Sequence, residues 1–236
     1  MKIYADLHLS PPLNDVANAS SMANTLKELE TQVVGLVIPP DRLTPVPPTF
    51  SSFREVGIDV AKRLNLNPRS REELLKSLRK FRGTYEIIAV ECNTPTVARV
   101  AVRDKRVDIV RFPKRRLGSI FRRRLANTCR AALEFNLSDL TQSPEPETVL
   151  HGLRRQIETA AEACTSVVGS TNASDALGLR APRDVAAVLR MLGLSSEASL
   201  AAVSENPINI VRQNRLRIGG PELEEGVRVV RRAVPQ

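Results

Sequence analysis

Asp6 and His8 are the residues near the N-terminus whose types and spacing suit chemistry. They follow a short apolar stretch, residues 2–5, that is typical of a β-strand, and side chains two residues apart on an extended backbone point to the same side. A carboxylate and an imidazole placed in this way can hold a divalent metal ion. In a β/α barrel, the carboxyl end of the first strand belongs to the face that carries active sites. A metal-dependent phosphoesterase is therefore one hypothesis for this chain.

The rest of the chain supplies few further metal ligands. His151 is the other histidine of the sequence, and it falls on a predicted outer helix. A hydrolytic site with two or three metal ions needs several more ligands, and Glu91, Asp139 and Asp175 do not complete such a set. We therefore predict no bound metal and no catalytic residue. We expect the N-terminal aspartate and histidine to be structural groups at the mouth of the barrel, joined to each other or to loop amides.

Other catalytic patterns are missing from the sequence as well. It contains no Ser-His-Asp arrangement with a supporting context, no phosphate-binding loop and no dinucleotide fingerprint. The glycine pair at residues 219–220 is too weak a signal to count as one. Binding is therefore a better hypothesis for this chain than catalysis.

Positive charge is concentrated in one segment, residues 99–130. It holds twelve Lys and Arg residues against Asp104 and Asp108, a net charge of +10, whereas the whole chain carries +9. A local excess of this size indicates a polyanion as partner. The alternatives are a solvated arginine-rich surface without a partner and a protein-only scaffold whose arginines meet acidic proteins. The candidate phosphate-binding residues of the segment are Lys114, Arg115, Arg116, Arg122, Arg123 and Arg130.

Aromatic residues limit the way in which such a partner could be bound. The chain has two Tyr, six Phe and no Trp. Recognition of single strands depends on aromatic side chains on which the bases stack. The sequence therefore favours contacts from Arg and Lys to phosphates over base stacking.

Residues 82–113 contain the clearest βαβ unit. Residues 85–90 and 107–112 are short apolar runs rich in β-branched side chains, and Pro95 between them can open a helix with Arg99 and Arg103 on its polar side. Strands too apolar to leave either face in water belong in a parallel sheet with helices packed outside it. We expect the rest of the chain to repeat this unit.

The remaining pattern predicts a single α/β barrel of about seven parallel strands with outer helices. Further strands are expected at residues 2–5, 33–38, 55–64, 131–137 and 166–170. Helices are expected at residues 21–32, 71–81, 114–130, 144–164, 180–193, 195–204 and 207–213. The proline-rich loop 39–50 is expected to contain no helix. The barrel should cover residues 1–215, and residues 216–236 should form a C-terminal tail that is partly helical or disordered.

The sequence also indicates where in the cell the protein is located. No apolar run approaches the roughly 18 residues of a membrane span, and the start of the chain lacks the layout of a signal peptide. Cys92, Cys129 and Cys164 are odd in number and lack metal-binding or redox spacing, which indicates reduced thiols. We expect a cytoplasmic protein with no membrane partner.

Six motifs in a fixed order carry a resemblance to a known family. They lie at residues 4–8 (YADLH), 57–64 (GIDVAKRL), 86–92 (EIIAVEC), 105–113 (KRVDIVRFP), 180–185 (RAPRDV) and 203–207 (VSENP). Each motif is unspecific, but in order and spacing they resemble the archaeal and eukaryal ribonuclease P protein component 3 family. The resemblance implies a TIM-like barrel akin to the PHP phosphoesterases, with most metal ligands lost.

The resemblance also implies a function, partners and further site residues. It implies an accessory subunit of ribonuclease P, the complex that removes 5′ leaders from precursor tRNA and in which the RNA is the catalyst. The partners would be the ribonuclease P RNA, the RRM-like component 2 and other proteins of the complex, with Mg²⁺ needed by the RNA and no cofactor on the protein itself. Carried over by position, Lys62, Arg63, Arg180 and Arg183 become RNA-binding candidates.

Overall fold

The fold is a barrel of seven parallel strands that follow one another in chain order. It is seen in a computed structural model that describes residues 2–43, 47–113, 120–219, 222–224 and 227–228. Each strand pairs in parallel with the next. The strands are β1 (Tyr4–Leu9), β2 (Thr31–Val37), β3 (Asp59–Leu66), β4 (Ile87–Glu91), β5 (Ile109–Arg111), β6 (Ala132–Asn136) and β7 (Val167–Ser170). The predicted fold class is confirmed.

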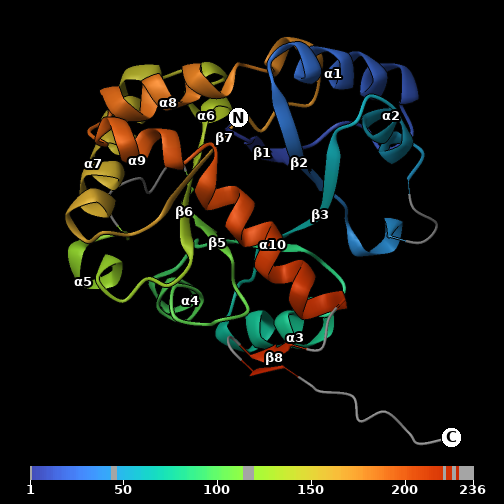
Figure 1. Ribbon diagram of the computed structural model, residues 1–236. Helices are drawn as coiled ribbons and strands as arrows, with labels where there is room; N and C mark the ends of the chain where they lie inside the picture. The colour runs from blue at the N-terminus through green and yellow to red at the C-terminus, as the bar shows by residue number, and fades with distance from the viewer. Residues whose placement is uncertain (1, 44–46, 114–119, 220–221, 225–226, 229–236) are drawn as a thin grey trace, which may run out of the picture.

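Helices surround the strands on the outside (Figure 1). They are α1 (Val16–Glu28), α2 (Thr49–Glu55), α3 (Arg71–Phe81), α4 (Pro95–Ala101), α5 (Arg123–Ala126), α6 (Leu137–Thr141), α7 (Pro146–Glu162), α8 (Pro182–Met191), α9 (Ser196–Ala201) and α10 (Glu205–Gly219). Two short 3₁₀ helices, η1 (Pro40–Arg42) and η3 (Ala176–Gly178), lie in the connections. No described helix is both long enough and apolar enough to cross a membrane.

The turn between α9 and α10 takes the place of an eighth strand. Within the described residues no ladder joins β1 to β7. Instead, the Ala5 amide donates to the carbonyl of Val203 (3.0 Å), and the Gly169 amide donates to the carbonyl of Ala202 (2.9 Å). The predicted number of about seven barrel strands agrees with the described part of the chain. Two of the backbone amides that such a strand would have satisfied, those of Ala5 and Gly169, are thus paired with the turn.

Helix α10 closes the amino-terminal end of the barrel. The inward-facing residues at that end are apolar, and Val211 and Ile208 of α10 pack against them. Arg215 anchors the helix to the sheet, because its guanidinium donates to Asp59 (2.6 and 2.8 Å) and to Glu86 (2.5 Å). In Figure 1 this helix crosses the front of the barrel. The predicted helix at residues 207–213 is therefore too short, since α10 continues through Gly219, beyond the predicted end of the barrel.

Side-chain hydrogen bonds cap the start of α3. The Ser70 side chain accepts a hydrogen bond from the Glu73 amide, and the Glu73 carboxylate accepts one from the Arg69 amide. The pattern resembles a capping box, in which the glutamate accepts from the amide of the cap residue itself. Here Glu73 accepts from Arg69, the residue before the cap. The helix spans residues 71–81, as predicted.

The proline-rich loop does contain helix, contrary to the prediction. α2 begins directly after Pro47 and Pro48, and η1 begins at Pro40. Proline fits the first turn of a helix because the amide that it lacks would have no partner there. The third strand accordingly starts at Asp59, after Gly57 in a left-handed conformation (φ 84°), and not at residue 55.

The helix predicted over residues 114–130 is also wrong in its described part. Residues 114–119 lie outside the described part of the chain, and α5 covers only four residues. Arg122 has an extended backbone (φ −112°, ψ 163°) that ends any helical register before α5. Phe121 reaches the core through an aromatic contact with Phe112, at 5.1 Å between ring centroids. Phe121 is therefore buried without being part of a helix.

Candidate nucleic-acid interface and the polar mouth of the barrel

Arg63 and Glu134 form an ion pair inside the carboxyl-terminal half of the barrel. Two guanidinium nitrogens of Arg63 donate to the two carboxylate oxygens of Glu134, at 2.5 and 2.7 Å, and both side chains are fully buried. The other donors of Arg63 reach the Leu7 carbonyl (3.0 Å) and the Asn65 amide oxygen (2.7 Å). Gly35 leaves room for that carbonyl, because a Cβ there would lie 2.2 Å from the Leu7 oxygen.

This geometry corrects the prediction that Arg63 binds RNA. Side chains alternate along a strand, and Ala61 on the same strand is part of the interior cluster, so Arg63 points inward as well. A fully buried guanidinium with a carboxylate partner is not available to a phosphate. Glu134 is the sequence signal that could have revealed this, because a carboxylate within an apolar strand needs a buried cation or donors.

His8 is held in the same interior by two asparagines. Its Nε2 atom lies 3.1 Å from the Asn65 side-chain amide nitrogen, and its Nδ1 atom lies 3.1 Å from the Asn136 oxygen and 3.3 Å from a Glu134 oxygen. This arrangement suits a neutral ring that accepts at Nε2 and donates from Nδ1. Burial and the charge of Arg63 lower the pKa of His8 to about 4. We name Arg63, Glu134, His8, Asn65 and Asn136 the mouth network.

Asp6 joins the first strand to the loop after the last one. Its carboxylate accepts hydrogen bonds from the amides of His8 and Thr171, both at 3.1 Å, and from the Thr171 hydroxyl at 2.5 Å. Burial raises the pKa of Asp6 to about 6. The hydrogen bonds to loop amides that the sequence analysis predicted for Asp6 are therefore present.

The mouth of the barrel does not fit a metal centre. The described residues contain no group of three His, Cys, Asp or Glu side chains placed to hold an ion. The Glu134 carboxylate is paired with Arg63. Its charge is therefore balanced by a guanidinium and not by a metal ion. Asp175 accepts from the Gly178 amide at the start of η3, and Asp139 lies 3.9 Å from Arg111. Each of these acidic residues thus serves a partner within the chain.

Five exposed arginines lie around α4. A groove of about 630 Å³ lies between α4 and residues 120–125, and a second groove of about 480 Å³ lies between α4 and α3. Arg99 and Arg103 line both grooves, so they form a ridge between them. Arg122 and Arg124 line the first groove and Arg71 the second. We name these residues the α4 basic surface: Arg71, Arg99, Arg103, Arg122 and Arg124.

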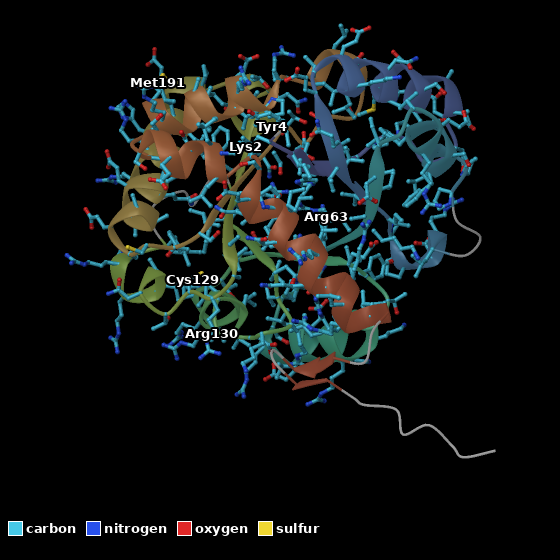
Figure 2. The ribbon with its side chains drawn as sticks, in the orientation of Figure 1. Lys2, Tyr4, Arg63, Cys129, Arg130 and Met191 are labelled. Carbon is cyan, nitrogen blue, oxygen red and sulfur yellow. The ribbon has the colours of Figure 1, made fainter. Side chains whose placement is uncertain are left out.

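The α4 basic surface contains only part of the predicted set. Arg122 belongs to it, and Arg123 is exposed on the adjoining helix α5. Arg130 is exposed but lines a different cavity, at the amino-terminal end of the strands. Arg130 lies near the lower edge of the molecule in Figure 2, whereas Arg63 lies near its middle. Three further candidates fall outside the described residues: Lys114, Arg115 and Arg116.

The remaining candidates lie on other elements and line none of these grooves. Lys62 is half-buried on β3, between two inward-facing residues. Arg180 is exposed and donates to the carbonyls of residues 177 and 179 (2.7 and 2.6 Å). Arg183 is exposed and packs against Tyr4, donating to its hydroxyl (3.3 Å). The structure thus does not bring these residues together with the α4 basic surface.

Four members of the α4 basic surface were not predicted as site residues: Arg71, Arg99, Arg103 and Arg124. Arg99 and Arg103 were counted in the charge of the segment, and their spacing of four residues after a helix-opening proline was the signal that could have placed them. Arg71 is far from them in sequence, and its place beside them depends on the packing of α3 against α4. Only the folded chain shows that contact.

These features define a class of protein: a β/α barrel whose mouth is filled by an internal ion-pair network and whose outer helices carry a basic surface. The family model described as RNase P subunit p30 matches residues 3–219 of the chain. The chain belongs to this family.

Individual relatives agree with this assignment. Ribonuclease P protein component 3 of Methanosarcina barkeri is 27% identical over 223 residues, which cover 90% of this chain and 91% of that protein. A chain in a cryo-EM structure of archaeal ribonuclease P with mature tRNA is similar with a TM-score of 0.78 at 22% identity, covering 98% of this chain and all of that one. Histidinol phosphate phosphatase of Lactococcus lactis is similar with a TM-score of 0.52 at 10% identity, covering 81% and 94%. The two structural likenesses show the shared fold.

Proposed function

We propose that this chain is a protein subunit of ribonuclease P that binds and supports the catalytic RNA during removal of 5′ leaders from precursor tRNA. The family supports the assignment to the complex, since curated relatives carry the name ribonuclease P protein component 3. The α4 basic surface supports RNA binding. It is the observation that carries the proposal for the molecule itself, because it presents several guanidinium groups on one exposed face.

The shape of the α4 basic surface suits a phosphate backbone. Arginine binds phosphate through a planar fork of donors, and the ridge of Arg99 and Arg103 has a groove on either side. Such a ridge can contact phosphates of two neighbouring backbone segments. Contacts to phosphates position an RNA without reading its sequence.

Aromatic side chains do not offer an alternative way of binding. All eight Tyr and Phe residues lie within the described ranges, and seven of them are buried. The eighth, Phe81, is half-buried, and it packs against Tyr85 with 6.1 Å between ring centroids. The bases of a single strand therefore have little aromatic surface on which to stack. Binding through backbone phosphates is the mode that remains.

Within the complex, this proposal assigns the chemistry to the RNA. Mg²⁺ would be bound and used by the RNA, and the protein would hold no cofactor and supply no catalytic group. The arrangement of the barrel mouth supports this division, since His8 and Glu134 are both engaged in the mouth network. We further propose an RRM-like component 2 and other ribonuclease P proteins as partners, precursor tRNA as the substrate of the whole complex, and a cytoplasmic location.

The test measures affinity for the cognate ribonuclease P RNA with matched arginine variants. Arg99→Gln with Arg103→Gln removes the ridge, and Arg155→Gln with Arg190→Gln removes the same charge from exposed positions on α7 and α8. Each contact to a phosphate contributes to affinity, and the proposal places such contacts at the ridge and not on α7 or α8. We therefore expect the first variant to bind about tenfold more weakly and the second to bind nearly as the parent does.

Two outcomes would contradict the proposal. Equal loss in both variants would mean that net charge matters and the α4 basic surface does not. Unchanged RNA binding by the ridge variant, together with loss of binding to component 2, would make this surface a protein interface and favour the scaffold alternative.

A further inference from the structure

A second basic cavity lies at the amino-terminal end of the barrel strands, beside α10. Its volume is about 470 Å³, and its walls come from the ends of α3 and α10 and from the segments that lead into β5, β6 and β7. Five cationic residues and one carboxylate stand out among the residues that line it: Arg82, Lys105, Arg106, Arg130, Arg217 and Asp108. The cavity shares no lining residue with the α4 basic surface. We name it the α10 cavity.

Only part of this positive charge is neutralised within the chain. Arg82 pairs with Asp108 at 2.6 Å, and Arg106 pairs with Asp104 at 2.7 Å. Within the described ranges, no ion pair joins a carboxylate to the other three cations, which are Lys105, Arg130 and Arg217. The cavity therefore has a strong positive potential that an anion would relieve.

Arg82 supplies an independent sign of a missing acceptor. Its side chain is 9% exposed, and its terminal nitrogens donate to Asp108, to the Arg106 carbonyl and to the Asn214 side chain. Its Nε–H group is buried and has no hydrogen-bond partner among the described residues. Buried donors in native proteins nearly always have an acceptor. A donor without one, on a residue that lines a cationic cavity, points to a ligand with an acceptor oxygen.

The state of Arg217 agrees with unbalanced positive charge. Partial desolvation of the guanidinium and the neighbouring charge of Arg82 lower the pKa of Arg217, although the residue is exposed as a whole, and Asp108 offsets this only in part. An anion placed between the two guanidinium groups would remove that repulsion. Binding of the ligand would then offset the electrostatic free energy of repulsion among the cations at this end of the barrel.

We propose that the α10 cavity binds a phosphate group. The donors of Arg82, Arg130 and Arg217 come from three different elements, and a tetrahedral anion can accept hydrogen bonds from several directions at once. The cavity has room for more than one phosphate, so the ligand is either a free phosphate compound or a phosphodiester of an RNA backbone. This site goes beyond the proposed function, because it lies apart from the α4 basic surface and can be occupied without it.

Inorganic phosphate is the first probe of the site. The full chain is unfolded thermally in increasing sodium phosphate, at an ionic strength kept constant with sodium chloride. We expect phosphate to raise the unfolding midpoint beyond chloride, and Arg130→Gln with Arg217→Gln to weaken phosphate binding about tenfold or more. Both residues are exposed and their removal relieves repulsion among the cations, so without phosphate the variant should be at least as stable as the parent. Arg155→Gln with Arg190→Gln, at exposed positions on α7 and α8, is the matched control and should respond to phosphate as the parent does.

A spectroscopic readout addresses Arg82 directly. In a ¹H–¹⁵N spectrum, the signal that disappears in Arg82→Lys identifies the Nε–H group of Arg82. That signal should shift on addition of phosphate and stay unchanged on addition of chloride. The shift reports the acceptor at Nε itself, which a general effect of salt on stability would not produce.

A short RNA duplex separates the two sources of phosphate. If the RNA backbone occupies the α10 cavity, phosphate should compete with the duplex and Arg130→Gln with Arg217→Gln should weaken duplex binding. If a free phosphate compound occupies it, the duplex should bind that variant as it binds the parent, while phosphate binding is lost. Phosphate that acts no more strongly than chloride, or equally in the double variant and the parent, would overturn the proposal, whatever the α4 variants do to RNA affinity.

Discussion

Arg63 on β3 and Glu134 on β6 meet across the interior of the barrel through two hydrogen bonds of 2.5 and 2.7 Å. Their strands are three apart in the sheet order, so the pair spans the barrel and is not a contact between neighbouring strands. Both side chains are fully buried. The carboxyl-terminal half of the barrel thus has a polar interior in which the charge of Glu134 is balanced by Arg63.

Removing one partner of this pair should strongly destabilise the fold. In Arg63→Leu the Glu134 carboxylate stays buried without its cation, and the loss should be about 3–5 kcal/mol in the free energy of unfolding. Urea denaturation followed by circular dichroism measures it. Arg63→Leu combined with Glu134→Leu is the control. It should cost less than the sum of the two single variants, because it leaves no unpaired charge; additive losses would contradict this account.

The buried titratable groups of the mouth predict two opposing pH dependences. The pKa of Asp6 is raised from 3.8 to about 6, so the folded state binds the proton more tightly, and this group should lower stability as pH rises from about 4 to 6. The pKa of His8 is lowered from 6.5 to about 4, so the unfolded state takes up the proton first, and this group should raise stability over nearly the same range. In the parent the two contributions largely cancel.

Single variants should expose each contribution. Relative to the parent, His8→Asn should become less stable as pH rises from 4 to 6.5, and Asp6→Asn should become more stable as pH rises from 4 to 6. Each effect should reach about 3 kcal/mol at most, since two pKa units correspond to about that free energy. Urea denaturation at half-unit pH steps measures them. Flat difference curves for both variants would show that neither group titrates abnormally.

Much of the fold follows from local patterns that the sequence displays. The strands of a parallel barrel are buried on both faces, so runs such as residues 85–90 are recognisable by their apolar, β-branched composition. The cap at Ser70 marks the start of α3. The errors arose where tertiary contacts decide the structure and the helical spacing of apolar residues does not. In residues 120–130, Phe121 is buried against Phe112, and only the four residues of α5 are helical.

The candidate sites were less predictable, and the reason lies in the direction of side chains. Nothing in the sequence near Arg63 shows that it pairs with a carboxylate 71 residues later. The α4 basic surface needs Arg71 from α3 beside Arg99 from α4, and the α10 cavity needs Arg82, Arg130 and Arg217 at one end of the barrel. The charge count pointed to residues 99–130, but only the packing of helices around the barrel divides the described cations of that segment between the α4 basic surface and the α10 cavity.

Replacing Arg122 and Arg123 by Ala should make RNA binding less dependent on salt. Each phosphate contact releases condensed counterions, and for duplex DNA the slope of log K against log salt is about −0.9 per contact, so we expect the slope to flatten by about one to two units. Affinity measured at four or more salt concentrations gives the slope. Both side chains are exposed, so thermal stability should change little. An unchanged slope with loss of component 2 from pull-downs would assign these residues to a protein interface.

The purified protein without RNA should not cleave precursor tRNA in Mg²⁺. The nitrogens of His8 are held by Asn65 and Asn136, and the carboxylate of Asp6 already accepts three hydrogen bonds, so neither side chain is placed to activate a water molecule. Addition of the cognate RNA and component 2 should give cleavage, measured by gel analysis of 5′-labelled precursor. His8→Asn should keep that reconstituted activity within a few-fold. Cleavage by the protein alone that is lost in Asp6→Ala with His8→Ala would establish the phosphoesterase hypothesis instead.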